Sequence, residues 1–223
     1  MEKKRLVIVG DGPFAEIAYE YFTHDSDYDV VAFSVERNYI RRSSLFELPI
    51  IPFEEIEDFY PPGEYKVFVA ITYNQLNRLR TRLYQEAKNK GYELASYISS
   101  RAFVWCNCEI GEHCFIFENN VVQPFVRIGN NVILWSGNHI GHHAVIGDNC
   151  FISSHVVVSG LVRLGANCFL GVNATFFNNR VIGDDCIIGA GALVARNIGS
   201  NRLVQGPMSE STPLTPEIIE HLR

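Results

Sequence analysis

An apolar residue stands at every sixth position from residue 98 to residue 194, without an exception. This period matches neither the 3.6-residue turn of an α-helix nor the two-residue alternation of a β-strand. It is typical of a solenoid of short strands and tight turns, in which one inward position recurs on every face. The sequence therefore predicts a β-helix with the inward residues Ile98, Val104, Ile110, Ile116, Val122, Ile128, Leu134, Ile140, Ile146, Ile152, Val158, Leu164, Leu170, Phe176, Ile182, Ile188 and Val194.

A second period, of 18 residues, groups the hexapeptides in threes. Related pentapeptides begin at Ile110, Ile128, Ile146, Leu164 and Ile182, each with glycine in second place and most with Asn or Asp after it. Three hexapeptides thus form one triangular coil. We expect Gly and the following Asn or Asp at the corners, because they tolerate the backbone dihedrals with φ > 0 that a tight corner requires.

A small residue four positions after each long one suits the narrow interior of such a prism. These residues are Ala102, Cys108, Cys114, Val126, Val132, Ala144, Cys150, Val156, Val162, Cys168, Ala174, Cys186 and Ala192. Asn120, Asn138 and Arg180 interrupt the series. The two asparagines are 18 residues apart, so they either have a function or stack as a hydrogen-bonded ladder in successive coils.

Five of the six cysteines fall on the small inward position, and only Cys106 does not. Successive coils lie about 4.8 Å apart, so Cys150 and Cys168 are within reach of each other. In a reduced protein, thiols act as small apolar side chains, and core packing is the preferred interpretation. Cys106 and Cys108 lack the two-residue gap of a zinc-binding pair, so no metal is predicted.

The first 97 residues have the pattern of a small Rossmann-like α/β domain. Residues 5–9, 29–35 and 65–71 are predicted strands, and residues 92–97 lead into the solenoid as a last strand. Helices are expected from residue 13 to residue 22, over residues 52–59 and over residues 74–90. The last helix has an apolar face of Leu76, Leu79, Leu83 and Ala87, and its arginines, Arg78, Arg80 and Arg82, are expected in solvent.

A glycine-rich turn, Gly10-x-Gly12-x-x-Ala15, follows the first strand, and Glu36 follows the second. Such a turn suits a phosphate, because the backbone can approach closely and the next helix offers its N-terminal amides. A nicotinamide enzyme needs a second half to cover its cofactor, and the α/β pattern ends after about 95 residues. The turn is therefore predicted to hold the diphosphate of a nucleotide-linked substrate, or else it is a glycine turn required only for packing.

A net charge of −6 and an isoelectric point near 5.6 argue against nucleic acid or an anionic membrane as a partner. The apolar run of residues 6–9 ends at Gly10, too early for a signal peptide, and no segment is long enough to insert into a membrane. We therefore expect a cytoplasmic protein. It is divided into residues 1–97, the β-helix of residues 98–199, and a tail of residues 200–223 with a short helix at residues 216–222.

Together, the glycine turn and the hexapeptide repeats resemble a family of bacterial sugar acyltransferases. This family includes sialic acid O-acetyltransferases and the N-acetyltransferases of nucleotide-linked 4-amino sugars. The resemblance implies a left-handed parallel β-helix, a homotrimer, and acetyl-CoA bound between neighbouring prisms. It also implies that the N-terminal domain holds the nucleotide-linked sugar, at Gly10, Gly12, Pro13, Phe14 and Glu36.

The base of this family lies in the motif Ile-x-His-Asp/Glu-x-x-Ile-Gly-Asp/Glu, which corresponds to residues 140–148. The resemblance implies that His142 is the general base of acyl transfer, and that His143 replaces the acid that orients it. His139 and His155 are alternative bases. The implied acetyl-CoA contacts are His155, Gly160, Asn173, Gly189, Gly191 and Arg196, and Gly160 is expected to leave room for the pantetheine arm.

The resemblance thus implies an enzyme that acetylates the amino group of a nucleotide-linked 4-amino-dideoxy sugar for bacterial glycan biosynthesis. Transfer to the oxygen of a sialic acid-like sugar is a second interpretation. A third is a non-catalytic trimeric scaffold, although a scaffold has no need for four histidines within 17 residues, namely His139, His142, His143 and His155.

Overall fold

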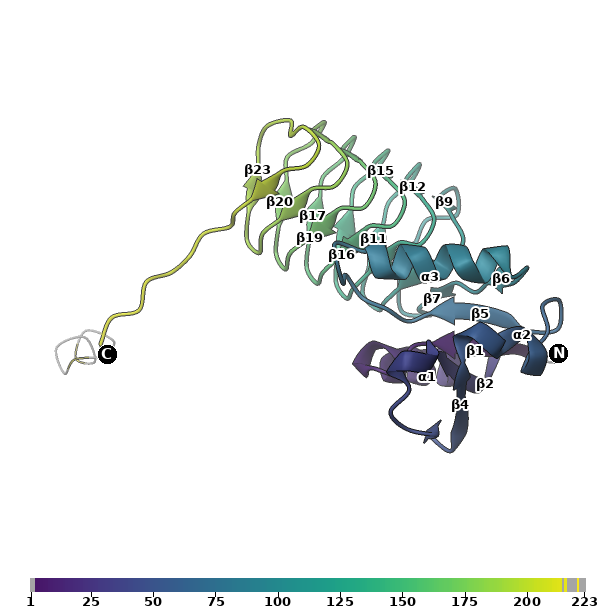
Figure 1. Cartoon of the computed structure of the whole chain (residues 1–223). Coiled ribbons are helices and arrows are strands. Elements are labelled where there is room, and N and C mark those ends of the chain that lie inside the picture. The colour runs from purple at the N-terminus through teal and green to yellow at the C-terminus, as the bar shows by residue number, and fades with distance from the viewer. Residues whose placement is uncertain (1–2, 214, 216–219, 221–223) are drawn as a thin grey trace.

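The computed structural model describes residues 3–213, 215 and 220, and shows an α/β domain packed against the side of a triangular prism (Figure 1). The α/β domain forms a sheet in the order β3-β4-β2-β1-β5-β6, parallel throughout except for β3 and β4. Its elements are β1 (Lys4–Val9), α1 (Pro13–His24), β2 (Tyr28–Val35), η1 (Arg37–Tyr39), β3 (Ser44–Leu45), β4 (Leu48–Pro52), η2 (Phe53–Glu55), α2 (Ile56–Phe59), β5 (Lys66–Val69), α3 (Arg78–Asn89) and β6 (Glu93–Leu94).

The three predicted long strands are confirmed as β1, β2 and β5, and the predicted helices correspond to α1, α2 with η2, and α3. The sequence pattern missed β3 and β4. It also placed the start of α3 four residues too early, because Gln75, Leu76 and Asn77 have φ of 51°, 50° and 66°. These left-handed dihedrals cannot continue into a right-handed helix, so α3 begins at Arg78.

The prism is a left-handed parallel β-helix, as the resemblance implied, and each of its strands has two residues. The first sheet contains β7 (Tyr97–Ile98), β10 (Phe115–Ile116), β13 (Ile133–Leu134), β16 (Phe151–Ile152), β19 (Phe169–Leu170), β22 (Ile187–Ile188) and β24 (Leu203–Val204). The second contains β8 (Phe103–Val104), β11 (Val121–Val122), β14 (His139–Ile140), β17 (Val157–Val158), β20 (Thr175–Phe176) and β23 (Leu193–Val194). The third contains β9 (Glu109–Ile110), β12 (Arg127–Ile128), β15 (Val145–Ile146), β18 (Arg163–Leu164) and β21 (Val181–Ile182).

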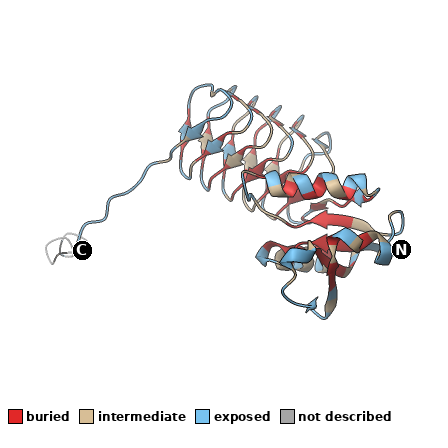
Figure 2. Cartoon of the chain, viewed as in Figure 1, coloured by how far each residue is buried: buried red, intermediate tan, exposed pale blue. Residues whose placement is uncertain are grey.

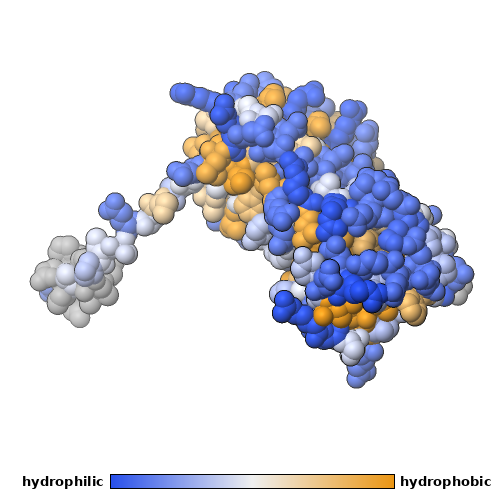
Figure 3. Space-filling view, viewed as in Figure 1, coloured by the Kyte–Doolittle hydropathy of each residue, from blue (hydrophilic) through white to orange (hydrophobic). Residues whose placement is uncertain are grey.

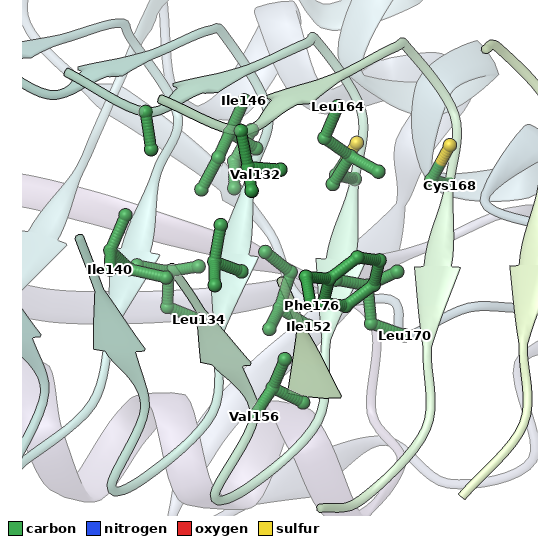
Figure 4. Close-up of a cluster of buried hydrophobic side chains, with 14 of the residues drawn as sticks. Val132, Leu134, Ile140, Ile146, Ile152, Val156, Leu164, Cys168, Leu170 and Phe176 are labelled. Carbon is green, nitrogen blue, oxygen red and sulfur yellow. The ribbon is translucent and has the colours of Figure 1, made fainter. Parts of the chain in front are cut away.

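The predicted inward residues fill the prism, and from Ile116 to Val194 all of them are buried (Figure 4). Pairing at a spacing of 18 stacks like on like, as Leu134 on Ile152. In the first coil, Val104 and Ile110 are half-buried and Ile98 has 42% of its surface exposed, because no coil precedes them. Core packing of the cysteines is confirmed by four free thiols with no exposed surface, those of Cys114, Cys150, Cys168 and Cys186.

The corners use glycine differently from the prediction. The left-handed dihedral falls on the residue two positions after the glycine, as at Asn149 with φ of 63°. Gly147 itself does not have a positive φ. A Cβ on Gly147 would lie 2.6 Å from the backbone of Gly165, so the glycine is required because successive coils approach too closely for a side chain.

The two interior asparagines do not form the ladder that was one of their interpretations. Asn120 and Asn138 each donate from Nδ2 to the carbonyl oxygen of Trp135, and Asn138 Oδ1 accepts from the amide of Val156 at 2.8 Å. A ladder does exist at the corner between the third and first sheets. There Asn131 donates to Asn149 at 2.8 Å, and Asn149 donates to Asn167 at 3.1 Å.

The α/β domain packs on the first sheet of the prism through a cluster of aromatic rings. Phe14 and Phe22 of α1 lie with Phe68 of β5 against Phe115, at ring-centroid distances of 5.5, 5.7 and 5.3 Å. The helix α3 packs beside this cluster at the asparagine corner and is buried along one side only (Figure 2). The two halves therefore share one apolar core, which fixes their relative position.

Arg80 lies on the buried side of α3, so the prediction that it lies in solvent is wrong. No part of its surface is exposed, whereas Arg78 and Arg82 are exposed and paired with Asp185 and with Glu36 and Glu86. Burial lowers the pKa of Arg80 to about 9, which leaves it charged at pH 7. Its guanidinium donates to neutral oxygens, which include Asn131 Oδ1 at 3.0 Å and the carbonyl of Asn149 at 3.0 Å.

His113 completes this contact between the two halves. Its Nε2 accepts the amide proton of Val69 at 2.8 Å, which leaves Nδ1 to donate to Asn131 Oδ1 at 2.9 Å. The ring stacks on Phe68 with a centroid distance of 4.7 Å. Burial lowers the pKa of His113 to about 3, so the ring is neutral over the physiological range.

Gly206 and Pro207 lie against Ala190 and Gly191, and the chain that follows, to residue 213, extends away from the prism (Figure 1). The short helix expected over residues 216–222 lies, apart from Glu220, outside the described residues. None of the helices in the described part of the chain is long and apolar enough to cross a membrane.

We predict that His113 makes the protein sensitive to acid. Its pKa is lower in the folded chain than in the unfolded chain, so the unfolded chain binds the extra proton between about pH 6.5 and pH 3. The free energy of unfolding should therefore fall over this range by up to about 1.4 kcal/mol per pH unit from this residue, and stay unaffected by it above pH 6.5.

Urea unfolding of His113→Gln should give lower stability at pH 7 and a flatter dependence on pH than the wild type. His24→Gln, which alters an exposed histidine, is the matched control and should keep the wild-type slope. An unchanged slope in His113→Gln would contradict this account of the contact.

Candidate active site

The corner between the second and third sheets presents His142 and His143, both exposed. The chain turns there because His143 adopts a left-handed φ of 58°, and its ring stacks on Phe125 of the preceding coil at 4.6 Å. The backbone amide of His142 donates to Gln123 Oε1 at 2.9 Å. Both histidines are thus held by side chains one coil earlier.

The two imidazoles meet through their Nδ1 atoms at 3.2 Å. Only one of the two can carry the proton between them when both rings are neutral. If His142 donates, its Nε2 keeps a free lone pair, and a proton taken up there leaves the contact with His143 intact. His143 can therefore accept the hydrogen bond of His142 Nδ1 and so orient the His142 ring. In the family motif, an acidic residue at the same position has this role.

The space next to Gly160, one coil further on, is occupied by the ring of His142. A Cβ on Gly160 would lie 2.6 Å from His142 Nε2. The absence of a side chain at Gly160 thus allows the ring of His142 to pack against this corner. That Gly160 leaves room for a pantetheine arm stays a prediction.

Four of the other predicted prism residues fall on two corners, and two lie on flat sides. Arg196 is exposed on the corner of His142, three coils and roughly 14 Å further along. His155 and Asn173 are on the corner between the first and second sheets, and both have left-handed dihedrals. Gly191 continues that corner, Gly189 lies on the flat side before it, and His139 is half-buried on β14. The structure thus separates His155 from His142.

The two glycines of the turn after β1 have different reasons to lack a side chain. Gly10 has φ of 119°, and a Cβ there would lie 3.0 Å from the carbonyl oxygen of Ala70. Gly12 has φ of −84°, and no atom of the described chain lies within 4 Å of where its Cβ would be. The fold therefore requires glycine at position 10 but not at position 12, where the open space faces outward.

A pocket of about 450 Å³ opens at this turn between the ends of β1 and β2 and one side of α3. The turn itself contributes Gly10 and Gly12. The apolar walls come from Val9, Val35, Ile71, Leu79 and Leu83, and the polar rim from Asp11, Glu36, Tyr39, Gln75 and Arg82. Glu36 is salt-bridged to Arg82 at 3.0 Å, and this carboxylate, with that of Glu86, raises the pKa of Arg82.

A smaller pocket of about 280 Å³ adjoins the other side of Gly12 and is lined by Pro13 and Phe14. The ring of Phe14 belongs to the aromatic core, so the residue has little surface left to offer a ligand.

The sequence patterns did not single out Tyr39, Gln75 or Arg82 as pocket residues, nor Arg42, which pairs with Asp11 beside the turn. Within the described chain, no group of three or more His, Cys, Asp or Glu side chains is arranged to hold a metal ion.

Residues 107–140 and 125–160 each match the family described as bacterial transferase hexapeptide (six repeats). The matched residues lie within the β-helix, from β9 to β17. A search of curated protein sequences finds no match.

Solved structures match nearly the whole chain. The acetyltransferase domain of PglB from Neisseria gonorrhoeae is 21% identical, with a TM-score of 0.82 over 92% of this chain and 97% of that one. PerB from Caulobacter crescentus, solved with CoA and GDP-perosamine, is 26% identical, with a TM-score of 0.79 over 90% and 93%. A histidine-to-asparagine mutant of perosamine N-acetyltransferase from the same bacterium, with the same two ligands, is also 26% identical, with a TM-score of 0.80 over 90% and 93%.

We predict that Gly160→Ala displaces the imidazole of His142, because the added Cβ would overlap Nε2. The fold should survive, since the corner beside Gly160 is open to solvent around the exposed His142 ring. The imidazole NMR signals of His142 and His143 should shift in this variant, while those of His24 should stay unchanged. Unshifted signals for His142 would show that its ring does not lie on Gly160 in solution.

Proposed function

We propose that this protein is an acetyl-CoA-dependent N-acetyltransferase that acts on the amino group of a nucleotide-linked 4-amino-dideoxy sugar. The observation that carries the proposal is the pairing, on one chain, of the corner histidine His142 with an open glycine-turn pocket at Gly12. The 26% identity to PerB, whose structure contains CoA and GDP-perosamine, supports the same reaction class.

In the proposed reaction, the sugar nitrogen attacks the thioester carbonyl as a neutral amine, and His142 Nε2 accepts the proton that this nitrogen loses. The new N–C bond forms as the C–S bond breaks, and the proton on His142 neutralises the leaving thiolate. His143 accepts a hydrogen bond from His142 Nδ1 throughout, which stabilises the imidazolium while it exists.

The N-terminal pocket is the proposed site of the nucleotide sugar. Its glycine turn opens α1, where Pro13 has no amide proton and the amides of Ala15 and Glu16 donate to the carbonyl oxygen of Gly12. The amides proposed to meet a phosphate oxygen are therefore those of Gly12 and Phe14. Val35, Leu79 and Leu83 provide an apolar slot for the nucleoside, and Glu36 offers a carboxylate to the ribose hydroxyls. Acetyl-CoA is proposed to contact His155, Asn173, Gly189, Gly191 and Arg196 along the later coils.

We further propose that the active site is shared between chains of a homotrimer. The α/β domain covers the first sheet of the prism, whereas His142 lies on the corner opposite that sheet, so a nucleotide sugar in the pocket is far from the base of its own chain. Exposed apolar side chains around the second sheet suit a contact between copies: Phe103, Trp105, Phe125, Val157, Leu161, Phe177 and Leu193. Apolar surface gathers on the prism beside the root of the C-terminal segment (Figure 3).

The experiment that tests the reaction class is incubation of the purified protein with acetyl-CoA and a panel of UDP-, dTDP- and GDP-linked 4-amino sugars, with free thiol release as the signal. Turnover on one nucleotide supports the proposal and identifies the substrate. Turnover only with a free sialic acid-like sugar would favour O-acetylation, and no turnover with any acceptor would favour a scaffold.

We predict that His142→Ala lowers kcat by about 100-fold or more, the scale of a lost general base. The oligomer should stay intact, because the side chain is exposed and lies outside the core. His139→Ala is the matched control on the same coil and should retain most of the activity. Wild-type turnover by the His142 variant would show that His142 is not the general base.

We predict that Gly12→Val raises the KM for the nucleotide sugar by at least tenfold and leaves the KM for acetyl-CoA unchanged. The valine meets no protein atom at its Cβ, so its methyl groups fill the pocket rather than disturb the fold. Steady-state kinetics and the melting temperature together check this. A parallel rise in both KM values would show that the turn does not hold the acceptor.

A further inference from the structure

The left-handed turn of Gln75, Leu76 and Asn77 forms part of the wall of the proposed nucleotide pocket. Gln75 lines that pocket between Ile71 and Leu79, and Asn74 lines the smaller pocket on the other side of Gly12. Three successive residues other than glycine with positive φ are unfavourable for L-amino acids. Such a turn persists only where the surrounding structure holds it in place.

The groups that hold this turn come from the prism. Asn77 has no exposed surface, and its Nδ2 lies 3.3 Å from the carbonyl oxygen of Cys168 and 3.4 Å from that of Asn167. Its Oδ1 accepts a hydrogen bond from Arg80 Nη1 at 3.1 Å. Asn77 therefore ties the end of the turn to the asparagine corner of the prism.

Arg80 ties the beginning of the turn to the same corner. Its Nη1 also donates to the carbonyl oxygen of Thr72, while Nη2 reaches the carbonyls of Asn149 at 3.0 Å and Cys150 at 3.3 Å. Tyr73, between the two anchored residues, packs its ring on Phe151 and Phe169 of the first sheet. Both ends of the segment of residues 72–77 are thus held by carbonyl groups of the β-helix, at Thr72 through Arg80 and at Asn77 directly.

We propose that Asn77 and Arg80 are positioning residues for the nucleotide sugar, through which the prism shapes the wall of a pocket that lies wholly in the other domain. This inference rests on the proposed function of the pocket. Arg80 does not line the pocket, so it acts through the turn. The fork of its guanidinium is required because a single cation at one point cannot bridge Thr72 and two coils of the prism.

The test compares Arg80→Met and Asn77→Gly with Arg78→Met, a control on the same helix whose arginine also reaches the prism, through Asp185, but is exposed. Asn77→Gly tolerates the positive φ and loses only the anchor, so it keeps the test informative if Arg80→Met does not fold. Calorimetry with UDP, dTDP and GDP measures nucleotide affinity, calorimetry with CoA measures the prism site, and amide hydrogen exchange measures the turn.

We expect both test variants to raise the Kd of the preferred nucleotide by about tenfold and to accelerate exchange over residues 72–79, with the Kd of CoA unchanged. The KM for the nucleotide sugar should rise in proportion, kcat should change less than twofold, and Arg78→Met should match the wild type. Wild-type nucleotide affinity in both variants would overturn the proposal.

If the wild type binds none of the nucleotides, the proposed function fails, and hydrogen exchange then decides separately about the anchor. Unchanged exchange over residues 72–79 in both variants would overturn the anchoring itself, whereas faster exchange would support it.

Discussion

The stacking of identical coils is the constraint on which the rest of the structure depends. Each coil of the prism must place its long and small apolar residues directly over those of the previous one, or the interior cannot be filled. This requirement also aligns the residues outside the core, because a fixed 18-residue coil turns every corner position into a column. One column carries His142 and Arg196, another carries His155 and Asn173, and the third carries the asparagines that receive α3.

The third column explains how a buried arginine is tolerated. The N–H donors of a buried guanidinium must be satisfied by acceptors of the protein, since an unpaired buried charge is strongly destabilising. Arg80 meets six neutral oxygens, four of them on the prism corner, where carbonyls of successive coils point the same way. The repeat thus provides a regular set of hydrogen-bond acceptors. His113 is the first residue of the same column, and its ring accepts a hydrogen bond from Val69 of β5.

The prism could be predicted almost completely from the sequence, because its period is encoded at every sixth residue. The α/β domain was predictable in outline, but β3 has only two residues, and β4 contains Pro49 and Pro52, which argue against a strand. The burial of Arg80 could have been predicted from the sequence. With Leu76, Leu83 and Ala87, Arg80 follows the spacing of four, three and four residues that marks one face of a helix. His113 likewise occupies the position that holds Asn131 and Asn149 in later coils.

The pocket was predictable only in part. Gly10, Gly12 and Glu36 belong to a recognisable turn and strand end, whereas Tyr39, Gln75 and Arg82 come from separate segments that only the folded sheet brings together. The pair of His142 and His143 was visible as a motif, but the contact of His142 with Gly160 depends on a rotamer that no spacing specifies.

The central claim is that a nucleotide sugar held by one chain reacts at His142 of another. The most direct measurement is complementation between His142→Ala and Gly12→Val chains, combined by co-expression and purified as mixed oligomers. At a nucleotide-sugar concentration well below the wild-type KM, where both parents are slow, the account predicts recovery of about a quarter of the wild-type activity. That share of interfaces in a random mixture joins an intact pocket to an intact histidine. Mixed oligomers no more active than the two parents would contradict it, because both elements would then have to act within one chain.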